Sequence, residues 1–145
     1  MLKKGDLAPD FKVMSHENKP VQLSDFKGKK VVLWFYPKAD TPGCTAEACG
    51  FRDRSEEFAA KDAILLGVSF DTVEENADFA RKYALDYPLL CDTQREIGIK
   101  YGACQDKADL YAQRIAYLID EKGLVEEVYA QVDARTFPEH ILGEI

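Results

Sequence analysis

Hydrophobic residues along the chain form short continuous runs separated by segments with helical periodicity. Two runs, at residues 31–36 and 63–70, are rich in β-branched and aromatic residues and are too short to be helices. Both are therefore expected to be buried strands of a parallel sheet. The segment between them is predicted to be helical to about Lys61, because Phe51 and Phe58 recur on one face of a helix.

Periodicity and turn residues mark the remaining elements. Alternating stretches at 11–13 and 21–23 flank a polar turn and predict a β-hairpin. Residues 24–28 predict one capped helical turn closed by a glycine. Further elements are expected in this order: a charged helix at 72–83, a short strand at 87–91, a helix at 95–101, two strands at 115–119 and 124–129 joined by a tight turn, and a short helix starting near 137.

The order of these elements indicates an α/β protein, with parallel crossovers first and an antiparallel hairpin last. It fits a thioredoxin-like fold with an N-terminal β-hairpin extension and a central mixed sheet flanked by helices. The chain has 145 residues and no linker, repeat or low-complexity segment, so a single domain over residues 1–145 is expected. A fold of this kind hosts several chemistries and does not by itself indicate function.

Charge narrows the range of partners. The formal net charge is −7, and the lysines and arginines are scattered along the chain. Nucleic acids and anionic membranes bind basic patches, so neither is expected as a partner. Lys3 and Lys4 lead into no apolar run, which indicates neither a signal peptide nor a membrane span. A cytoplasmic protein is therefore expected.

The chain contains four cysteines and two histidines. Without a secretory signal, the cysteines are not expected to form a structural disulfide framework. Each is then an inert core residue, a metal ligand or a redox-active thiol. His16 and His140 leave little for histidine-based catalysis or for a Cys/His zinc site, and both are expected to be ordinary surface residues.

Cys44 follows a buried strand and a short loop at the expected start of a helix. Thr41 or Gly43 can cap this helix, and Pro42 suits its first turn. Cys44 then lies where the helix dipole favours an anion, and the thiolate is the reactive form of cysteine. Making a thiol mostly thiolate at neutral pH takes about 2.7 kcal/mol, or two pKa units. The dipole supplies about 0.3–1 kcal/mol, so a nearby cation is needed.

Cys49 follows Cys44 by five positions, which is wider than the C-x-x-C redox pair. In an ideal helix the Cα atoms of two such residues are about 8.6 Å apart. A disulfide requires a Cα separation below about 7 Å, so the two thiols can bond only if the first turn and a half unwinds. A zinc clamp gains nothing from this arrangement. A redox cycle does, because a sulfenic acid at Cys44 can condense with Cys49 once the helix opens.

The sequence FYPKADTPGCT at residues 35–45 resembles the active-site segment of the peroxiredoxins, whose pattern is P-x-x-x-[T/S]-x-x-C. The sequence CTAEACGFRD at residues 44–53 is similar to the branch called bacterioferritin comigratory protein or peroxiredoxin Q. The resemblance covers most of the chain, with further matches at residues 8–11, 23–29 and 118–120.

This resemblance implies a thiol peroxidase that reduces hydrogen peroxide and organic hydroperoxides without a metal, haem or flavin cofactor. Cys44 matches the peroxidatic cysteine, which becomes a sulfenic acid. Cys49 matches the resolving cysteine, which would form an intramolecular disulfide with Cys44. Thioredoxin or a similar dithiol protein would then reduce this bond. Because the cycle needs no second subunit, a monomer is expected.

Four further residues match the family's active site. Thr41 matches the hydroxyl that hydrogen-bonds thiolate and peroxide, and Pro37 matches the proline that shields the site from water. Arg114 matches the arginine that stabilises thiolate and substrate, and would be the missing cation. Glu47 matches the acid that helps to hold this network.

Simpler interpretations stand beside these. Taken alone, Arg114 would be a solvated charge at a strand edge, Glu47 a partner of the helix dipole, and Cys49 a packing residue. Cys91 and Cys104 are expected to be core residues. Because the motif does not cover the loop that contains Cys104, an intermolecular or alternative resolving role stays open for it.

Two more positions near the motif concern packing rather than chemistry. Arg52 is expected to be a structural or ion-pairing residue. The family often has a small hydroxyl residue near Ala116, so the packing beside Arg114 is expected to differ from the family's.

Two other functions remain open. A thioredoxin-like disulfide oxidoreductase without peroxidase activity would share the fold, but it should carry the C-x-x-C pair that this chain lacks. A non-enzymatic thiol or metal-binding module would use the four cysteines. Their positions, 44, 49, 91 and 104, contain no C-x-x-C knuckle.

Overall fold

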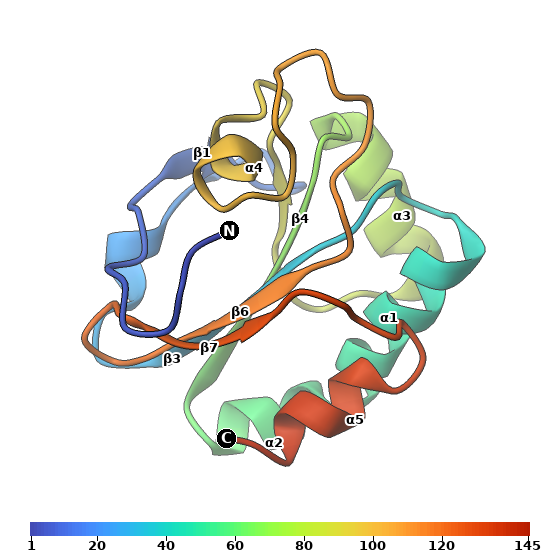
Figure 1. The fold of residues 1–145 in the computed structure, drawn as a ribbon. Helices are drawn as coiled ribbons and strands as arrows, with labels where there is room; N and C mark the ends of the chain where they lie inside the picture. The colour runs from blue at the N-terminus through green and yellow to red at the C-terminus, as the bar shows by residue number, and fades with distance from the viewer.

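The computed structural model describes residues 1–145 (Figure 1). In chain order its elements are β1 (Lys12–Met14), β2 (Pro20–Gln22), the 3₁₀ helix η1 (Leu23–Phe26), β3 (Lys30–Phe35), α1 (Pro42–Asp53), α2 (Ser55–Ala60), β4 (Ala63–Ser69), α3 (Val73–Tyr83), β5 (Leu89–Cys91), α4 (Glu96–Lys100), β6 (Ala116–Ile119), β7 (Val125–Tyr129) and α5 (Phe137–Leu142). No helix is both long and apolar enough to cross a bilayer.

A five-stranded sheet in the order β5-β4-β3-β6-β7 forms the centre of the molecule. The β4 strand pairs in parallel with both β3 and β5. The β6 strand pairs antiparallel with both β3 and β7. The β1–β2 hairpin stands outside this sheet. The α1, α2, α3 and α5 helices lie on one side of the sheet, and α4 with the N-terminal segment lies on the other (Figure 1). The predicted mixed sheet, its flanking helices and the N-terminal hairpin are all confirmed.

Alternation along β3 divides the core into two layers, because successive side chains of a strand point to opposite faces. Val31, Leu33 and Phe35 belong to the cluster that packs against the N-terminal segment and α4. Trp34 faces the opposite side, in the cluster that contains Cys44. Cys44 therefore packs against the face of the sheet to which Trp34 points.

The predicted helical character does extend to about Lys61, but it is divided at Arg54 into two helices, α1 and α2. Arg54 leaves helical geometry, with φ −113° and ψ 8°. The chain turns here because α1 packs against α5, whereas α2 packs against β4. Phe51 and Phe58 still meet in one cluster, with ring centroids 5.7 Å apart. The hydrophobic periodicity is therefore preserved across the break and does not reveal it.

His16 is half-buried, which makes the prediction of an ordinary surface residue wrong; His140 is exposed, as predicted. The Nδ1 atom of His16 accepts a hydrogen bond from the Leu89 N–H at 3.1 Å, and the His16 N–H donates to the Leu89 carbonyl at 2.8 Å. These bonds join the turn after β1 to the edge strand β5. Pairing between such distant segments leaves no pattern in the sequence around His16.

The half-buried imidazole of His16 predicts a specific loss of stability in acid. Burial lowers the pKa of His16 below the ordinary value of about 6.5. The unfolded chain therefore takes up this proton first, so the stability contribution is present above pH 6.5 and is lost as pH falls below it. The urea midpoint is expected to fall more between about pH 7.5 and about pH 5.5 in the wild type than in His16→Gln. Equal falls in both proteins would contradict this assignment.

Candidate active site

The loop after β3 delivers the start of α1 to the carboxyl end of the parallel strands. Pro42 occupies the first helical position, as predicted, and Thr41 is the N-cap residue with extended backbone. The Thr41 hydroxyl does not cap the helix and instead donates to the Lys38 carbonyl at 2.7 Å. With no capping side chain, the N–H groups of the first turn remain available to an anion.

Cys44 lies in this first turn and is fully buried, in contact with the cluster around Trp34. Cys49 lies further along the same helix and is half-buried. Burial raises the pKa of the Cys49 thiol, and the neighbouring Arg52 partly offsets this effect. Both thiols are free, and the helix between them is intact.

Arg114 is the cation that approaches Cys44. It lies just before β6, where the Phe35 N–H donates to the Ile115 carbonyl at 2.8 Å and extends the pairing with β3. Its Nη2 atom lies 3.4 Å from the Cys44 sulfur. A Cβ at Gly43 would lie only 3.0 Å from the same nitrogen, so the glycine allows this approach. The sequence analysis predicted a cation beside Cys44, and the Arg114 guanidinium lies at that position.

Glu47 holds the other arm of the guanidinium. Its Oε1 atom accepts a hydrogen bond from Arg114 Nη1 at 2.8 Å, whereas its Oε2 atom has no partner. The side chain is fully buried. This burial raises the pKa of Glu47 to about 7, although the bond to Arg114 acts in the opposite direction. Glu47 is therefore partly protonated near neutral pH.

Pro37 begins the loop that leads to Thr41, and it is half-buried. Asp71, which the sequence analysis did not single out, fixes this loop. Its carboxylate accepts from the Ala39 N–H at 2.8 Å and pairs with Lys38 Nζ at 2.7 Å. The sequence did hold a signal for Asp71, because it is an acidic residue directly after the buried run that forms β4. The carboxyl ends of adjacent parallel strands lie at one edge of the sheet, so a residue after β4 is expected near the loop after β3.

The loop has a second attachment, to the end of α3. Asp40 adopts a left-handed backbone conformation with φ 60°. Its carboxylate accepts from the Tyr83 hydroxyl at 2.8 Å and pairs with Lys82 Nζ at 2.9 Å. Contacts with β4 and α3 therefore fix the backbone that precedes Cys44.

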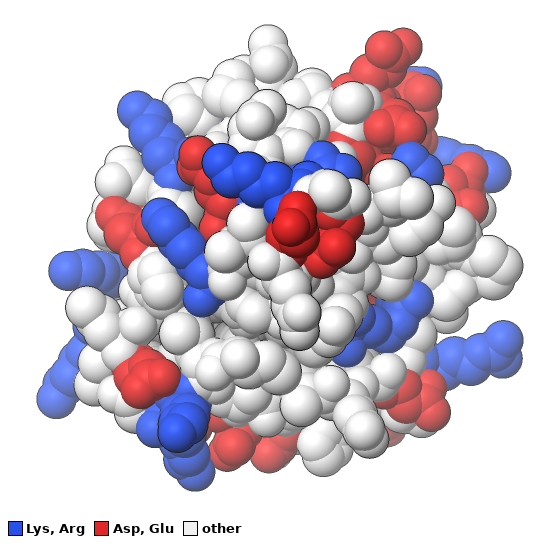
Figure 2. All heavy atoms as spheres, turned by 45° about the horizontal axis from the view of Figure 1, so that its top comes forward, with Lys and Arg blue, Asp and Glu red and all other residues white.

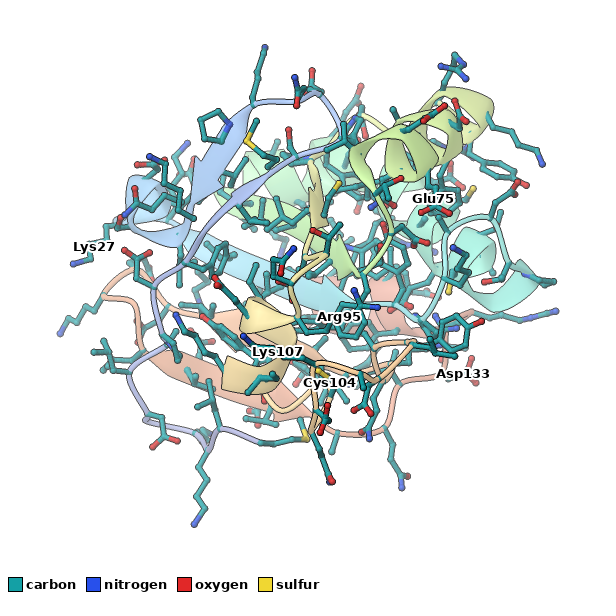
Figure 3. All side chains as sticks on the ribbon, turned by 90° about the horizontal axis from the view of Figure 1, so that it is seen from above. Lys27, Glu75, Arg95, Cys104, Lys107 and Asp133 are labelled. Atoms are coloured by element: carbon teal, nitrogen blue, oxygen red, sulfur yellow. The ribbon has the colours of Figure 1, made fainter.

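The other two cysteines belong to the core, as predicted. The Cys91 sulfur accepts from the Asn76 side-chain amide at 3.4 Å. Cys104 is buried against Gly98, where an added Cβ would lie 3.0 Å from its sulfur. In Figure 3, Cys104 lies with Arg95 in the region of α4 and the loop that follows it, whereas Glu75 lies on α3. Arg52 pairs with Asp53 at 2.9 Å, which confirms its structural role.

Charged residues of both signs are interspersed over the face shown in Figure 2, with uncharged surface between them. This face carries no continuous basic area. The arrangement agrees with the net charge of −7 and with the scattered lysines and arginines of the sequence.

Comparisons with known proteins give a consistent result. Residues 4–128 match the AhpC/TSA family. The chain is 38% identical to "Putative peroxiredoxin bcp" of Coxiella burnetii, over 97% of both chains. It is 41% identical to "Peroxiredoxin Q, chloroplastic" of Sedum lineare, over 87% of this chain and 68% of that one.

Solved structures agree with these relatives. The crystal structure of peroxidoxin BcpB from Mycobacterium tuberculosis superposes with a TM-score of 0.90 at 35% identity, covering 99% of this chain and 96% of that one. A PrxQ mutant from Xylella fastidiosa gives a TM-score of 0.92 at 26% identity, covering 99% of this chain and 95% of that one.

Proposed function

The chain belongs to the AhpC/TSA family, in the group of peroxiredoxins named Bcp and peroxiredoxin Q, and is a thiol peroxidase; on that premise we propose that Cys44 is the sulfur that attacks the peroxide. The thiolate attacks the terminal oxygen of the hydroperoxide, and the O–O bond breaks. Cys44 becomes a sulfenic acid, and the leaving alkoxide or hydroxide takes up a proton to give alcohol or water. Hydrogen peroxide and organic hydroperoxides are both substrates.

The approach of Arg114 to Cys44, at 3.4 Å, carries this proposal. A fixed guanidinium there stabilises the thiolate and the negative charge that develops on the peroxide oxygens. Glu47 orients that guanidinium through its 2.8 Å bond to Nη1. These donors are held in place by the protein before peroxide arrives, so little reorganisation accompanies the reaction.

Thr41 and Pro37 complete the proposed site. The Thr41 hydroxyl uses its proton on the Lys38 carbonyl, so its oxygen lone pairs can accept a hydrogen bond from the peroxide O–H. Pro37 lies in the loop fixed by Asp71 and limits the access of water to Cys44.

Cys49 is proposed to resolve the sulfenic acid. Its thiolate attacks the Cys44 sulfur, the S–O bond breaks, and the hydroxide leaves as water after protonation. Because the intact helix keeps the two residues apart, this step requires residues 42–49 to unwind. A dithiol protein such as thioredoxin then reduces the bond. The cycle runs within one chain, so we propose a single-domain cytoplasmic monomer that needs no cofactor.

The test is to add one equivalent of hydrogen peroxide to the reduced protein and map its peptides without reduction. A disulfide between Cys44 and Cys49 within a monomer is expected, and Cys49→Ser is expected to stop at the sulfenic acid. A bond from Cys44 to Cys104 or to another chain would discard Cys49 as the resolving residue. An unoxidised Cys44 would contradict the whole assignment. Cys91→Ser is the matched control and should leave the mapped bond unchanged.

A further inference from the structure

Only two side chains from other elements hydrogen-bond to the first half of α1, residues 42–49. Arg114 contacts Cys44 and Glu47 at 3.4 and 2.8 Å. The Tyr87 hydroxyl donates to the carbonyl of Ala48 at 2.8 Å. No other side chain from outside the helix hydrogen-bonds to this half. These hydrogen bonds, together with the packing of Cys44 and Ala48 in the core, oppose its unwinding.

The second half of the same helix is anchored separately. Arg52 Nη1 donates to the Tyr83 carbonyl at 2.6 Å, and the ring of Phe51 lies 5.0 Å from that of Trp34. At Gly50 an added Cβ would approach Pro138 of α5 to 2.8 Å, which shows how closely the two helices pack. Unwinding can therefore stop near Gly50 and leave the rest of α1 in place.

The two restraints on the first half respond differently to oxidation. The contact of Arg114 with Cys44 is strongest when the sulfur is a thiolate, and it weakens when the sulfur becomes a neutral sulfenic acid. The bond from Tyr87 to the Ala48 carbonyl involves neither sulfur and is the same in both states. Tyr87 is only 6% exposed, and its ring packs edge-on to Trp34 at 6.2 Å. Its hydroxyl thus has a fixed position.

We propose that Tyr87 is a positioning residue whose hydroxyl, bound to the Ala48 carbonyl, sets how often residues 42–49 open and thereby decides the fate of oxidised Cys44. This inference rests on the proposed roles of Cys44 and Cys49. With the helix closed, Cys44 keeps its place beside Arg114, where it reacts with peroxide, and is out of reach of Cys49. With the helix open, the two sulfurs can meet and the hydroxyl of Tyr87 loses its acceptor.

Two reactions compete for the sulfenic acid. In the first, the Cys49 thiolate displaces hydroxide from the Cys44 sulfur, and disulfide and water result. In the second, the sulfenate attacks another peroxide, whose O–O bond breaks, and sulfinic acid and alcohol or water result. The second reaction consumes one further two-electron equivalent of peroxide and needs no unwinding. A tighter hold on residues 42–49 therefore favours the sulfinic acid.

Tyr87→Phe removes the hydroxyl and keeps the ring against Trp34. Loss of one buried hydrogen bond is expected to raise the open population about five-fold. Disulfide formation after a pulse of hydrogen peroxide should accelerate by about the same factor, and about five-fold more peroxide should be needed to convert half of Cys44 to sulfinic acid. The first oxidation of Cys44 should be unchanged, because the closed helix remains the major state. Intact mass at quenched times separates these products.

Tyr101→Phe is the matched control. Its hydroxyl is also held in the core and donates to a backbone carbonyl, that of Pro9 at 2.6 Å, but on the other side of the sheet. It should lower global stability without changing the distribution between disulfide and sulfinic acid. A control variant that shifts this distribution as much as Tyr87→Phe would overturn the proposal.

Hydrogen exchange gives a readout that does not depend on peroxide chemistry. In the reduced protein, amide exchange of residues 45–53, whose N–H groups donate to carbonyls four positions earlier in the opening segment, should rise about five-fold in Tyr87→Phe, while exchange of α2 stays at the wild-type rate. Unchanged exchange in the first half overturns the proposal, as does faster exchange without faster disulfide formation. Failure of Cys49 as the resolving residue would appear earlier, in the peptide map of the wild type.

Discussion

Replacing Arg114 with glutamine is expected to lower the rate constant for oxidation of Cys44 by about 10²–10³. The side chain supplies the only cation in contact with the sulfur, at 3.4 Å, and the dipole of α1 is too weak to replace it. The loss should appear in the first oxidation itself, measured from the intact mass of the reduced protein at quenched times after peroxide is added. Arg114→Lys should recover part of the rate, because it restores the charge but not the two-armed contact with Cys44 and Glu47.

Arg52→Gln is the matched control for this change. Arg52 is also an arginine beside α1, but it binds Asp53 and the Tyr83 carbonyl rather than Cys44. Its replacement should leave the first oxidation at the wild-type rate. If both variants reacted alike, or if Arg114→Gln reacted as fast as the wild type, the guanidinium would have no role in activating the thiol.

Replacing Glu47 with glutamine is expected to stabilise the protein in alkali relative to acid. Burial raises the pKa of Glu47 to about 7 in the fold, so the folded protein binds this proton more tightly than the unfolded chain. The resulting stability is fully present below the unfolded pKa of about 4.3 and is lost as pH rises through about 7. Glutamine does not ionise, so this dependence should disappear.

The difference in unfolding free energy between Glu47→Gln and the wild type should shift in favour of the variant by about 2 kcal/mol between about pH 5 and about pH 8. Urea unfolding of both proteins at each pH measures it, and the comparison cancels the other titrating groups. Glu75→Gln is a suitable control, because Glu75 is half-exposed and its hydrogen bonds lower its pKa instead. A shift of opposite sign would mean that Glu47 remains ionised in the fold.

Much of the site could be predicted because its parts lie close together in sequence. The strand before the loop, the proline at the first helical position and the place of Cys44 in the first turn all follow from local patterns and were all found as predicted. The five-residue spacing of Cys44 and Cys49 likewise predicts that the helix must open before the two thiols can bond, and this opening remains a proposal. The break at Arg54 escaped the same reasoning, because the hydrophobic face continues across it.

The amino-acid sequence by itself determined the order of strands and helices, the position of Cys44 at a helix start and the need for a cation beside it. These features depend on periodicity and end effects over a few residues. Only the tertiary structure decided which groups surround that sulfur. The antiparallel register of β6 on β3 brings Arg114 to Cys44, and the packing of α1 on the sheet buries Glu47 and raises its pKa.

The restraints on the active-site loop and helix are of the same long-range kind. Asp71 binds the loop from the end of β4, and Tyr87 binds α1 from the segment before β5. Each bond joins residues 32 or more positions apart. Such contacts depend on how strands align and helices cross, and neighbouring residues in the sequence carry no record of that geometry.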